Sequence, residues 1–235
     1  MPAPVFAAFD PVRDAWPPLA DDGLHLWLLP HRRGERSTDA LRVCIARYLQ
    51  IDPHSVNMQR RENGRPVLAS PLSELRFSAS HSGDALLLGF MRGDCIGVDI
   101  ESLKPRPHVL ELTRRFFTAH EAAALAAMPI TEHEDAFYRL WTAKEALLKA
   151  IGHGLAHALS RVGFGFASCK LELRELDLQP LRTEAGVVIA TPSIEEWNLL
   201  ECAPLPGYRA SVMYSGVTRG IHALRIDHAW VSGAK

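Results

Sequence analysis

Residues 137–151 read FYRLWTAKEALLKAI and have the periodicity of a long α-helix. Trp141, Glu145 and Lys149 recur at i, i+4 and i+8, so they share one face of this helix. Lys144 and Lys149 bracket Glu145. The segment therefore combines a carboxylate and two cations on one rigid element, which is a pattern typical of a site for a charged substrate.

The limits of this helix follow from its flanking residues. Two pairs with S/T-x-x-E spacing predict capping boxes, Thr118 with Glu121 and Thr131 with Glu134. We expect the second pair to start the long helix. Glycine is the usual residue of a left-handed helix end, so the helix should stop at Gly152 or Gly154.

Residues 96–101 read IGVDIE and alternate as a strand does. Asp99 and Glu101 then point to one face, while Val98 and Ile100 point into the core. Together with Glu145 these two acids form a set of hard oxygen ligands with cations nearby, which favours Mg²⁺ holding a phosphorylated substrate over a zinc site.

Each pair taken alone has an ordinary alternative. Asp99 and Glu101 could be a solvated strand edge, and Glu145 with Lys149 could be a surface i, i+4 pair that contributes only about 0.2–0.5 kcal/mol. The three acids and the lysines must therefore be judged as one set.

Composition limits the function classes. The 235 residues are 47% hydrophobic, which is enough for a substantial core in one large or two small domains. The 26 basic residues nearly balance 27 acidic ones, so no global basic field for nucleic acid exists and any anion site is local. The chain has neither a Walker A motif nor a G-x-G-x-x-G motif before a helix, which argues against P-loop and dinucleotide enzymes.

The cysteines and the apolar segments predict a soluble cytoplasmic protein. The cysteines form no C-x-x-C pair and indicate neither structural zinc nor a disulfide framework. Asp10, Arg13 and Asp14 interrupt the apolar stretch that a signal peptide needs, and the longest apolar run, 85–91, is too short to cross a bilayer.

The remaining pattern predicts an α+β protein. A strand is expected at 24–29 and a helix at 38–50, and a meander is expected from three short apolar segments, 75–80, 85–91 and 95–100. A linker at 104–107 precedes the helical part, and further strands are expected at 164–173, 187–190, 197–202, 209–214 and 221–226. We expect two similar-sized α+β halves, residues 1–103 and 104–235, with the acids meeting in a cleft between them.

Several segments, in this order, resemble the 4'-phosphopantetheinyl transferases of the surfactin-synthetase-activating type. They are GRPVL at 64–68, FSASHSG at 77–83, IGVDIE at 96–101, RFF at 115–117 and WTAKEALLK at 141–149. The resemblance runs from the helix before Asp52 to about Leu155. It implies a pseudo-two-fold α+β fold and transfer of the phosphopantetheine arm of coenzyme A to a serine of an apo carrier protein, with release of 3',5'-ADP.

The resemblance also implies roles for the charged residues. Mg²⁺, or Mn²⁺ in its place, would be bound by Asp99, Glu101 and Glu145. Glu145 would act as the base, directly or through a metal-bound water, while Asp99 or Glu101 acting through water is the competing assignment. Lys149 would stabilise the leaving phosphate, and Lys144 would add positive potential at the pyrophosphate.

Coenzyme A contacts are implied for residues from both halves: Arg60, Arg65, Ser80, His81, Asp99, Lys144 and Lys149. Ser80 and His81 would lie near the 3'-phosphate, and Arg60 and Arg65 near the nucleotide end. The family's usual arginine at the start of the first helix is replaced here by the sequence STDA at 37–40, so Arg32, Arg33 or Arg36 would take its place.

The expected partners are coenzyme A and carrier proteins, with no nucleic acid, no membrane and a monomeric state. A docking surface is expected near Arg106, Arg114, Arg115, Phe116 and Phe117, unless the phenylalanines belong to the core. Two other functions remain open at this stage. One is another Mg²⁺-dependent enzyme acting on a phosphorylated small molecule, and the other is a non-catalytic coenzyme A-binding module.

Overall fold

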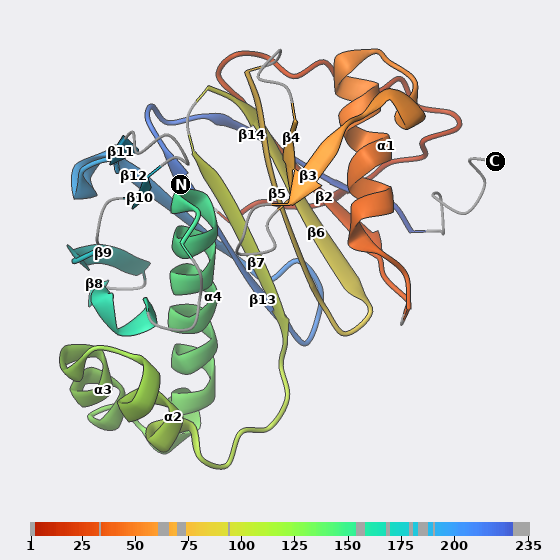
Figure 1. Ribbon diagram of the computed structural model, residues 1–235. Coiled ribbons are helices and arrows are strands. Elements are labelled where there is room, and N and C mark those ends of the chain that lie inside the picture. Colours follow the sequence, from red (N-terminus) through yellow and green to blue (C-terminus); the bar gives the residue numbers. More distant parts are fainter. Residues whose placement is uncertain are drawn as a thin grey trace.

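The computed structural model describes residues 3–32, 34–60, 66–69, 74–93, 95–153, 158–167, 170–178, 181–182, 188–189 and 191–227. Within these residues the strands form one five-stranded sheet, one three-stranded sheet and three two-stranded sheets. Helices lie on both larger sheets (Figure 1), so the expected α+β content is confirmed.

The five-stranded sheet carries the first long helix, α1 (Ser37–Leu49). Its strand order is β1-β14-β2-β6-β5, and β14 runs parallel to both of its neighbours. Buried apolar residues of α1 and of this sheet form one core cluster, which includes Leu41, Ile45 and Trp27. The strands span Ala7–Ala8, Gly220–Arg225, Gly23–Pro30, Ala85–Arg92 and Leu75–Ser82, in that spatial order.

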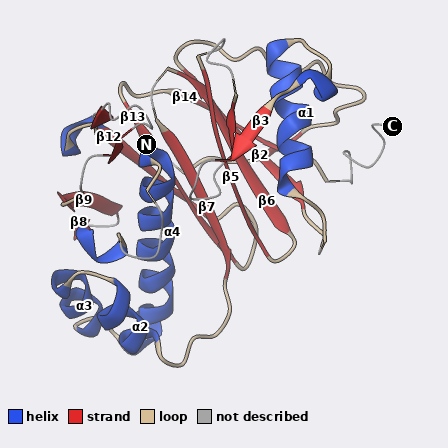
Figure 2. Ribbon diagram, viewed as in Figure 1, coloured by secondary structure: helices blue, strands red, loops and turns tan. Residues whose placement is uncertain are grey.

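The three-stranded sheet carries the long helix α4 (His133–Ile151). Its order is β12 (Trp197–Cys202), β13 (Tyr208–Ser215) and β7 (Ile96–Ser102), with both pairs antiparallel. Figure 2 shows α4 lying along this sheet, on the side away from α1. The helix ends at Gly152 in the left-handed conformation (φ 91°), as expected, and Gly154 lies outside the described residues.

A third core lies between the two larger sheets. Ile96, Val98 and Ile100 of β7 pack there with residues of β2 and β6 such as Leu26 and Leu87. The architecture is therefore layered as α1, five-stranded sheet, three-stranded sheet and α4.

Shorter elements complete the chain. Helices α2 (Val109–Phe116) and α3 (Ala119–Ala126) pack near the N-terminal end of α4 (Figure 1). The two-stranded sheets pair β3 with β4, β8 with β9 and β10 with β11, which span Met58–Arg60, Pro66–Leu68, Val162–Ala167, Lys170–Leu176, Leu181–Arg182 and Val188–Ile189. In the described part of the chain, every helix is too short or too polar to span a membrane.

The predicted meander is only partly correct. β5 and β6 form the expected antiparallel hairpin, but β7 pairs with β13 instead of β6. The reason is the chemistry of its two faces: the apolar face packs flat against the first sheet, and the face with Asp99 and Glu101 turns toward α4. The single strand expected at 164–173 is two strands, β8 and β9.

One of the two predicted capping boxes is confirmed. Thr118 accepts from the Glu121 backbone, and the Glu121 side chain accepts from the Thr118 backbone. The second is wrong, because α4 begins at His133 after a 3₁₀ turn and the Glu134 carboxylate accepts from the backbone N–H of Arg106 instead.

Each of the predicted halves, 1–103 and 104–235, contributes a strand that pairs with a strand of the other half. β7 belongs to the first by sequence but pairs with β13, and β14 belongs to the second but pairs with β2. The boundary near residue 104 and the pseudo-two-fold relation of the halves stay predictions.

Gly97 brings β7 and α4 together. A Cβ at this position would lie 1.9 Å from the backbone oxygen of Ala146 and 2.5 Å from the backbone nitrogen of Ala150. The backbone of α4 therefore rests directly on the strand that carries Asp99 and Glu101.

We predict that Gly97→Ala destabilises the protein by about 1–3 kcal/mol or more, because the new methyl group must push the α4 backbone away. Urea unfolding measures the change. Gly220→Ala is the matched control, since no heavy atom lies within 4 Å of a Cβ there. Equal stability of the two variants would show that α4 does not rest on Gly97.

Candidate active site

Asp99, Glu145 and Lys149 meet where β7 faces α4. The Nζ atom of Lys149 lies 2.5 Å from Oδ1 of Asp99 and 3.6 Å from Oε2 of Glu145. Ser80 of β5 joins them, because its hydroxyl donates to Asp99 Oδ1 at 2.7 Å and accepts from Lys149 Nζ at 2.8 Å. We call these four residues the acid cluster.

Contacts within the acid cluster shift the pKa values of Glu145 and Lys149. Burial, and next the negative charge of Asp99, raise the pKa of Glu145 to about 8. Burial alone would lower the pKa of Lys149, but Asp99 and Glu145 outweigh it and the pKa lies above its usual value. Lys149 therefore stays charged at neutral pH, while Glu145 can gain or lose a proton near that pH.

Glu101 lies beside the cluster, two residues along β7. Its Oε2 atom accepts a 2.7 Å hydrogen bond from the Ser82 hydroxyl. Burial raises the pKa of Glu101 and Asp99 adds to that effect, while Ser82 and Arg106 partly offset it.

The three carboxylates are ligands of the type that a divalent cation prefers, although in the described structure they are not arranged as a metal site. Among the described residues, no three His, Cys, Asp or Glu side chains have the arrangement of a metal site, so convergence of all three acids on one ion stays a prediction. One feature does favour a cation: Oδ2 of Asp99 is buried and lacks a hydrogen-bond partner in the described part of the chain. Buried carboxylate oxygens are normally satisfied, and Mg²⁺ prefers such oxygens as ligands.

Lys144 does not lie where its predicted contact with the pyrophosphate requires. It is fully buried on the other side of α4, where its Nζ atom lies 2.7 Å from Oε2 of Glu121 and donates to the carbonyl oxygens of Leu159 and Val162. The Glu121 carboxylate also accepts from the backbone of Phe164. All three N–H donors are used, so Lys144 joins α3, α4 and β8 and does not face a pyrophosphate beside Glu145.

Three other residues predicted for coenzyme A, Arg60, Ser80 and His81, lie in the described part of the chain. Ser80 belongs to the acid cluster, and His81 is exposed at the end of β5. Arg60 is exposed at the end of β3, and Arg65 lies outside the described residues. Their contacts with coenzyme A stay predictions.

His31 lies beside His81, a contact that the sequence does not indicate. Its ring lies 4.5 Å from that of His81, centroid to centroid, and its backbone donates to Asp84 at the β5–β6 turn. Burial, and next His81, lower the pKa of His31. An isolated histidine before a helix carries no signal of this pairing, which arises only from the hairpin.

Two sets of basic residues remain exposed. Arg32 and Arg36 precede α1, and Arg33 lies outside the described residues. In the expected docking surface, Arg114 and Arg115 are exposed, but Phe117 is buried and stacks on Phe137 at 5.3 Å. Phe117 therefore belongs to the core.

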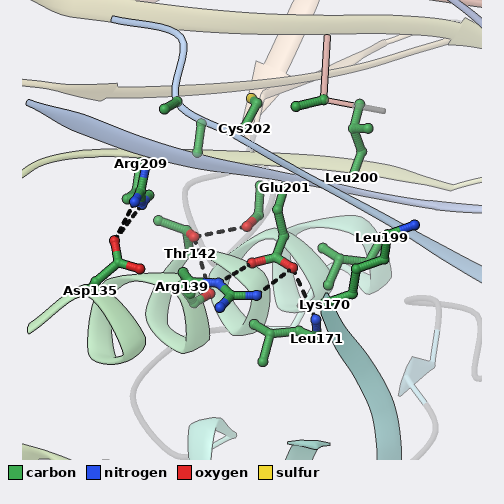
Figure 3. Close-up of a pocket in the computed structure, with 14 residues that line it drawn as sticks. Asp135, Arg139, Thr142, Lys170, Leu171, Leu199, Leu200, Glu201, Cys202 and Arg209 are labelled. Atoms are coloured by element: carbon green, nitrogen blue, oxygen red, sulfur yellow. Dashed lines mark hydrogen bonds and ion pairs between the residues drawn. The ribbon is translucent and has the colours of Figure 1, made fainter. Parts of the chain in front are cut away.

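A cavity of about 430 Å³ lies between α4 and strands β12 and β13 (Figure 3). Two ion pairs line it: Arg139 donates to both oxygens of Glu201, at 2.7 and 3.1 Å, and Arg209 donates to Asp135 at 2.7 Å. Thr142 and Ser211 hydrogen bond at 2.8 Å nearby. These contacts fix α4 on the sheet, and the acid cluster lies outside the cavity.

Comparisons with known proteins show the family to which the chain belongs. Residues 95–201 match the family model of the 4'-phosphopantetheinyl transferase superfamily. The chain is 33% identical over 187 residues to the 4'-phosphopantetheinyl transferase HetI of Nostoc sp. PCC 7120, covering 79% of this chain and 71% of HetI. It is 36% identical over 116 residues to Sfp of Bacillus subtilis, covering 49% of this chain and 50% of Sfp.

A human relative extends the similarity beyond bacteria. The L-aminoadipate-semialdehyde dehydrogenase-phosphopantetheinyl transferase of Homo sapiens is 32% identical over 158 residues, covering 63% of this chain and 47% of the human protein. The chain therefore belongs to the 4'-phosphopantetheinyl transferase superfamily. Within that class of enzymes it is of the Sfp-like type. The comparisons do not favour the two alternative functions.

We predict that Lys144→Met destabilises the fold by about 3–5 kcal/mol, because it leaves the Glu121 carboxylate buried without its cation. Urea unfolding measures this loss. Adding Glu121→Gln to Lys144→Met should recover part of it, and Lys170→Met, at an exposed lysine, should change stability by less than about 0.5 kcal/mol. A normal unfolding curve for Lys144→Met, combined with a raised KM for coenzyme A, would instead support a pyrophosphate contact.

Glu145→Gln should stabilise the metal-free protein increasingly as pH rises. The folded-state pKa of about 8 lies above the unfolded value, so the stability that the wild type has below about pH 4.5 is lost as pH rises through 8. Thermal unfolding in a chelating buffer from pH 5 to 8.5 checks this. The Tm difference between variant and wild type should grow with pH, and a constant difference would refute the raised pKa.

Proposed function

We propose that the chain transfers the 4'-phosphopantetheine arm of coenzyme A to a serine hydroxyl of an apo carrier protein and releases 3',5'-ADP, with Mg²⁺ bound. The observation that carries this proposal is the acid cluster, in which Asp99 of β7 and Glu145 of α4 both lie within hydrogen-bonding or ion-pair distance of the Lys149 amine. The names of the relatives support the same reaction class.

The reaction needs a base and a stabilised leaving group. The serine oxygen forms a bond to the β-phosphorus of coenzyme A, the bond from that phosphorus to the bridging oxygen breaks, and 3',5'-ADP carries off the electron pair. Glu145 takes the serine proton, since burial and Asp99 make its carboxylate a stronger base than an ordinary glutamate. Lys149 stabilises negative charge on the leaving phosphate.

Asp99, Glu101 and Glu145 are the proposed ligands of the cation. The unpaired Oδ2 atom of Asp99 supports this assignment. When bound, Mg²⁺ would shield the pyrophosphate charge and so make the phosphorus a better electrophile.

The carrier is proposed to dock beside Arg114 and Arg115. Both side chains are exposed on α2, and Arg115 lies 5.1 Å over the ring of the half-buried Phe116. A basic surface of this kind suits an acidic helix of a small domain.

The test is mass spectrometry of an apo carrier incubated with the enzyme, coenzyme A and Mg²⁺. We expect one phosphopantetheine on the carrier serine, and we expect Glu145→Gln to lower kcat/KM by about 10²–10⁴-fold.

In the same assay, charge reversal at Arg114 and Arg115 should raise KM for the carrier and leave KM for coenzyme A unchanged.

Glu195→Gln is the matched control, because this glutamate is exposed in the 3₁₀ turn Ile194–Glu196, just before β12, and lies outside the acid cluster. It should retain wild-type turnover. Hydrolysis of coenzyme A without transfer, or binding without any turnover, would sink the proposed reaction.

A further inference from the structure

Three serines alternate along β5, at positions 78, 80 and 82, so their side chains leave the strand on one face. That face meets β7, although β5 and β7 belong to different sheets and share no strand pairing. The two strands are joined by hydrogen bonds between each serine hydroxyl and a residue of β7. These three residues are called the serine row.

The members of the serine row differ in what they contact. Ser78 accepts from the backbone N–H of Val98 at 3.1 Å. Ser80 donates to Oδ1 of Asp99, and Ser82 donates to Oε2 of Glu101, each at 2.7 Å. Two of the three therefore contact an acid that is proposed to bind the cation, and one contacts only backbone.

The direction of each donated bond is determined by a second contact. A serine hydroxyl has one proton to donate. Ser82 accepts from the backbone N–H of Ser102 at 3.1 Å, and Ser80 accepts from Lys149 at 2.8 Å, so each hydroxyl keeps its proton for the carboxylate. The bond to Asp99 occupies Oδ1 and leaves the buried Oδ2 atom without a partner in the described residues.

We propose that Ser80 and Ser82 are positioning residues that hold the carboxylates of Asp99 and Glu101 in the orientation that binds the divalent cation. This inference rests on the proposed function. It gives Ser80 a different role from the phosphate contact implied by the family resemblance, because Asp99 accepts the one proton that the hydroxyl could donate to a phosphate oxygen. Hydrogen-bond partners of metal ligands commonly change metal affinity by 10–100-fold when they are removed.

The test measures Mn²⁺ binding by the paramagnetic resonance signal of free Mn²⁺. It uses the full chain with saturating coenzyme A and no carrier, so no transfer occurs, and a protein-free titration corrects for Mn²⁺ bound by coenzyme A. We expect Ser80→Ala and Ser82→Ala each to raise the Kd for Mn²⁺ about tenfold or more. Ser82→Thr should restore binding, because it keeps the hydroxyl.

Ser78→Ala is the matched control from the same face of the same strand. It loses a hydrogen bond to backbone but none to an acid, so its Tm should fall while its Kd for Mn²⁺ stays at the wild-type value. If Ser78→Ala weakens Mn²⁺ binding as much as the other two, the serine row acts only by joining the sheets and the inference is overturned. If Ser80→Ala does not fold, Ser80→Cys replaces it, because a thiol is only a weak hydrogen-bond donor to the carboxylate of Asp99.

A separate measurement distinguishes a failure of the proposed transfer reaction from a failure of the positioning role of Ser80 and Ser82. Wild-type transfer to an apo carrier tests the proposed function without any serine variant. If transfer occurs and both alanine variants bind Mn²⁺ as the wild type does, the positioning role is wrong and the function stands. If transfer occurs and only Ser80→Ala and Ser82→Ala raise the Mn²⁺ concentration needed for activity, with KM for coenzyme A unchanged, the positioning role is supported.

Discussion

The contact on which the rest of the site depends is the packing of the α4 backbone on Gly97. Any side chain at this position would collide with the carbonyl of Ala146. Because the helix lies so close to β7, short side chains on the two elements can reach one another. In this arrangement the side chains of Asp99 and Lys149 meet at 2.5 Å.

The interface between α4 and its sheet contains several polar contacts. Beyond the acid cluster it contains the Arg139–Glu201 and Arg209–Asp135 ion pairs and the hydrogen bond between Thr142 and Ser211. Each of these polar groups has a partner, and Thr142 and Ser211 are buried together because their hydroxyls satisfy one another. Such pairs also specify which helix residue stands opposite which strand residue, in a way that apolar packing alone does not. The result is that Glu145 faces Asp99, at a cost reflected in its raised pKa.

The two lysines of α4 show how much depends on helix rotation. They flank Glu145 in sequence and look equivalent there, yet Lys144 is buried with Glu121 and Lys149 reaches Asp99. Five residues of an α-helix turn the side chain to a different side, so neighbouring cations serve different parts of the structure. Lys144 completes the core around α3 and β8, and Lys149 belongs to the acid cluster.

The sequence by itself determined the elements that carry the site. Alternation placed Asp99 and Glu101 on one face of a strand, and the 3.6-residue period placed Glu145 and Lys149 on one face of a helix, because both patterns depend only on local backbone geometry. The order of short motifs was sufficient to indicate the family. Only the tertiary structure decided that β7 leaves the meander for β13, that Lys144 is a core residue and that the serine row of β5 reaches the acids. These features arise from contacts between residues far apart in the chain, and no local period in the sequence records them.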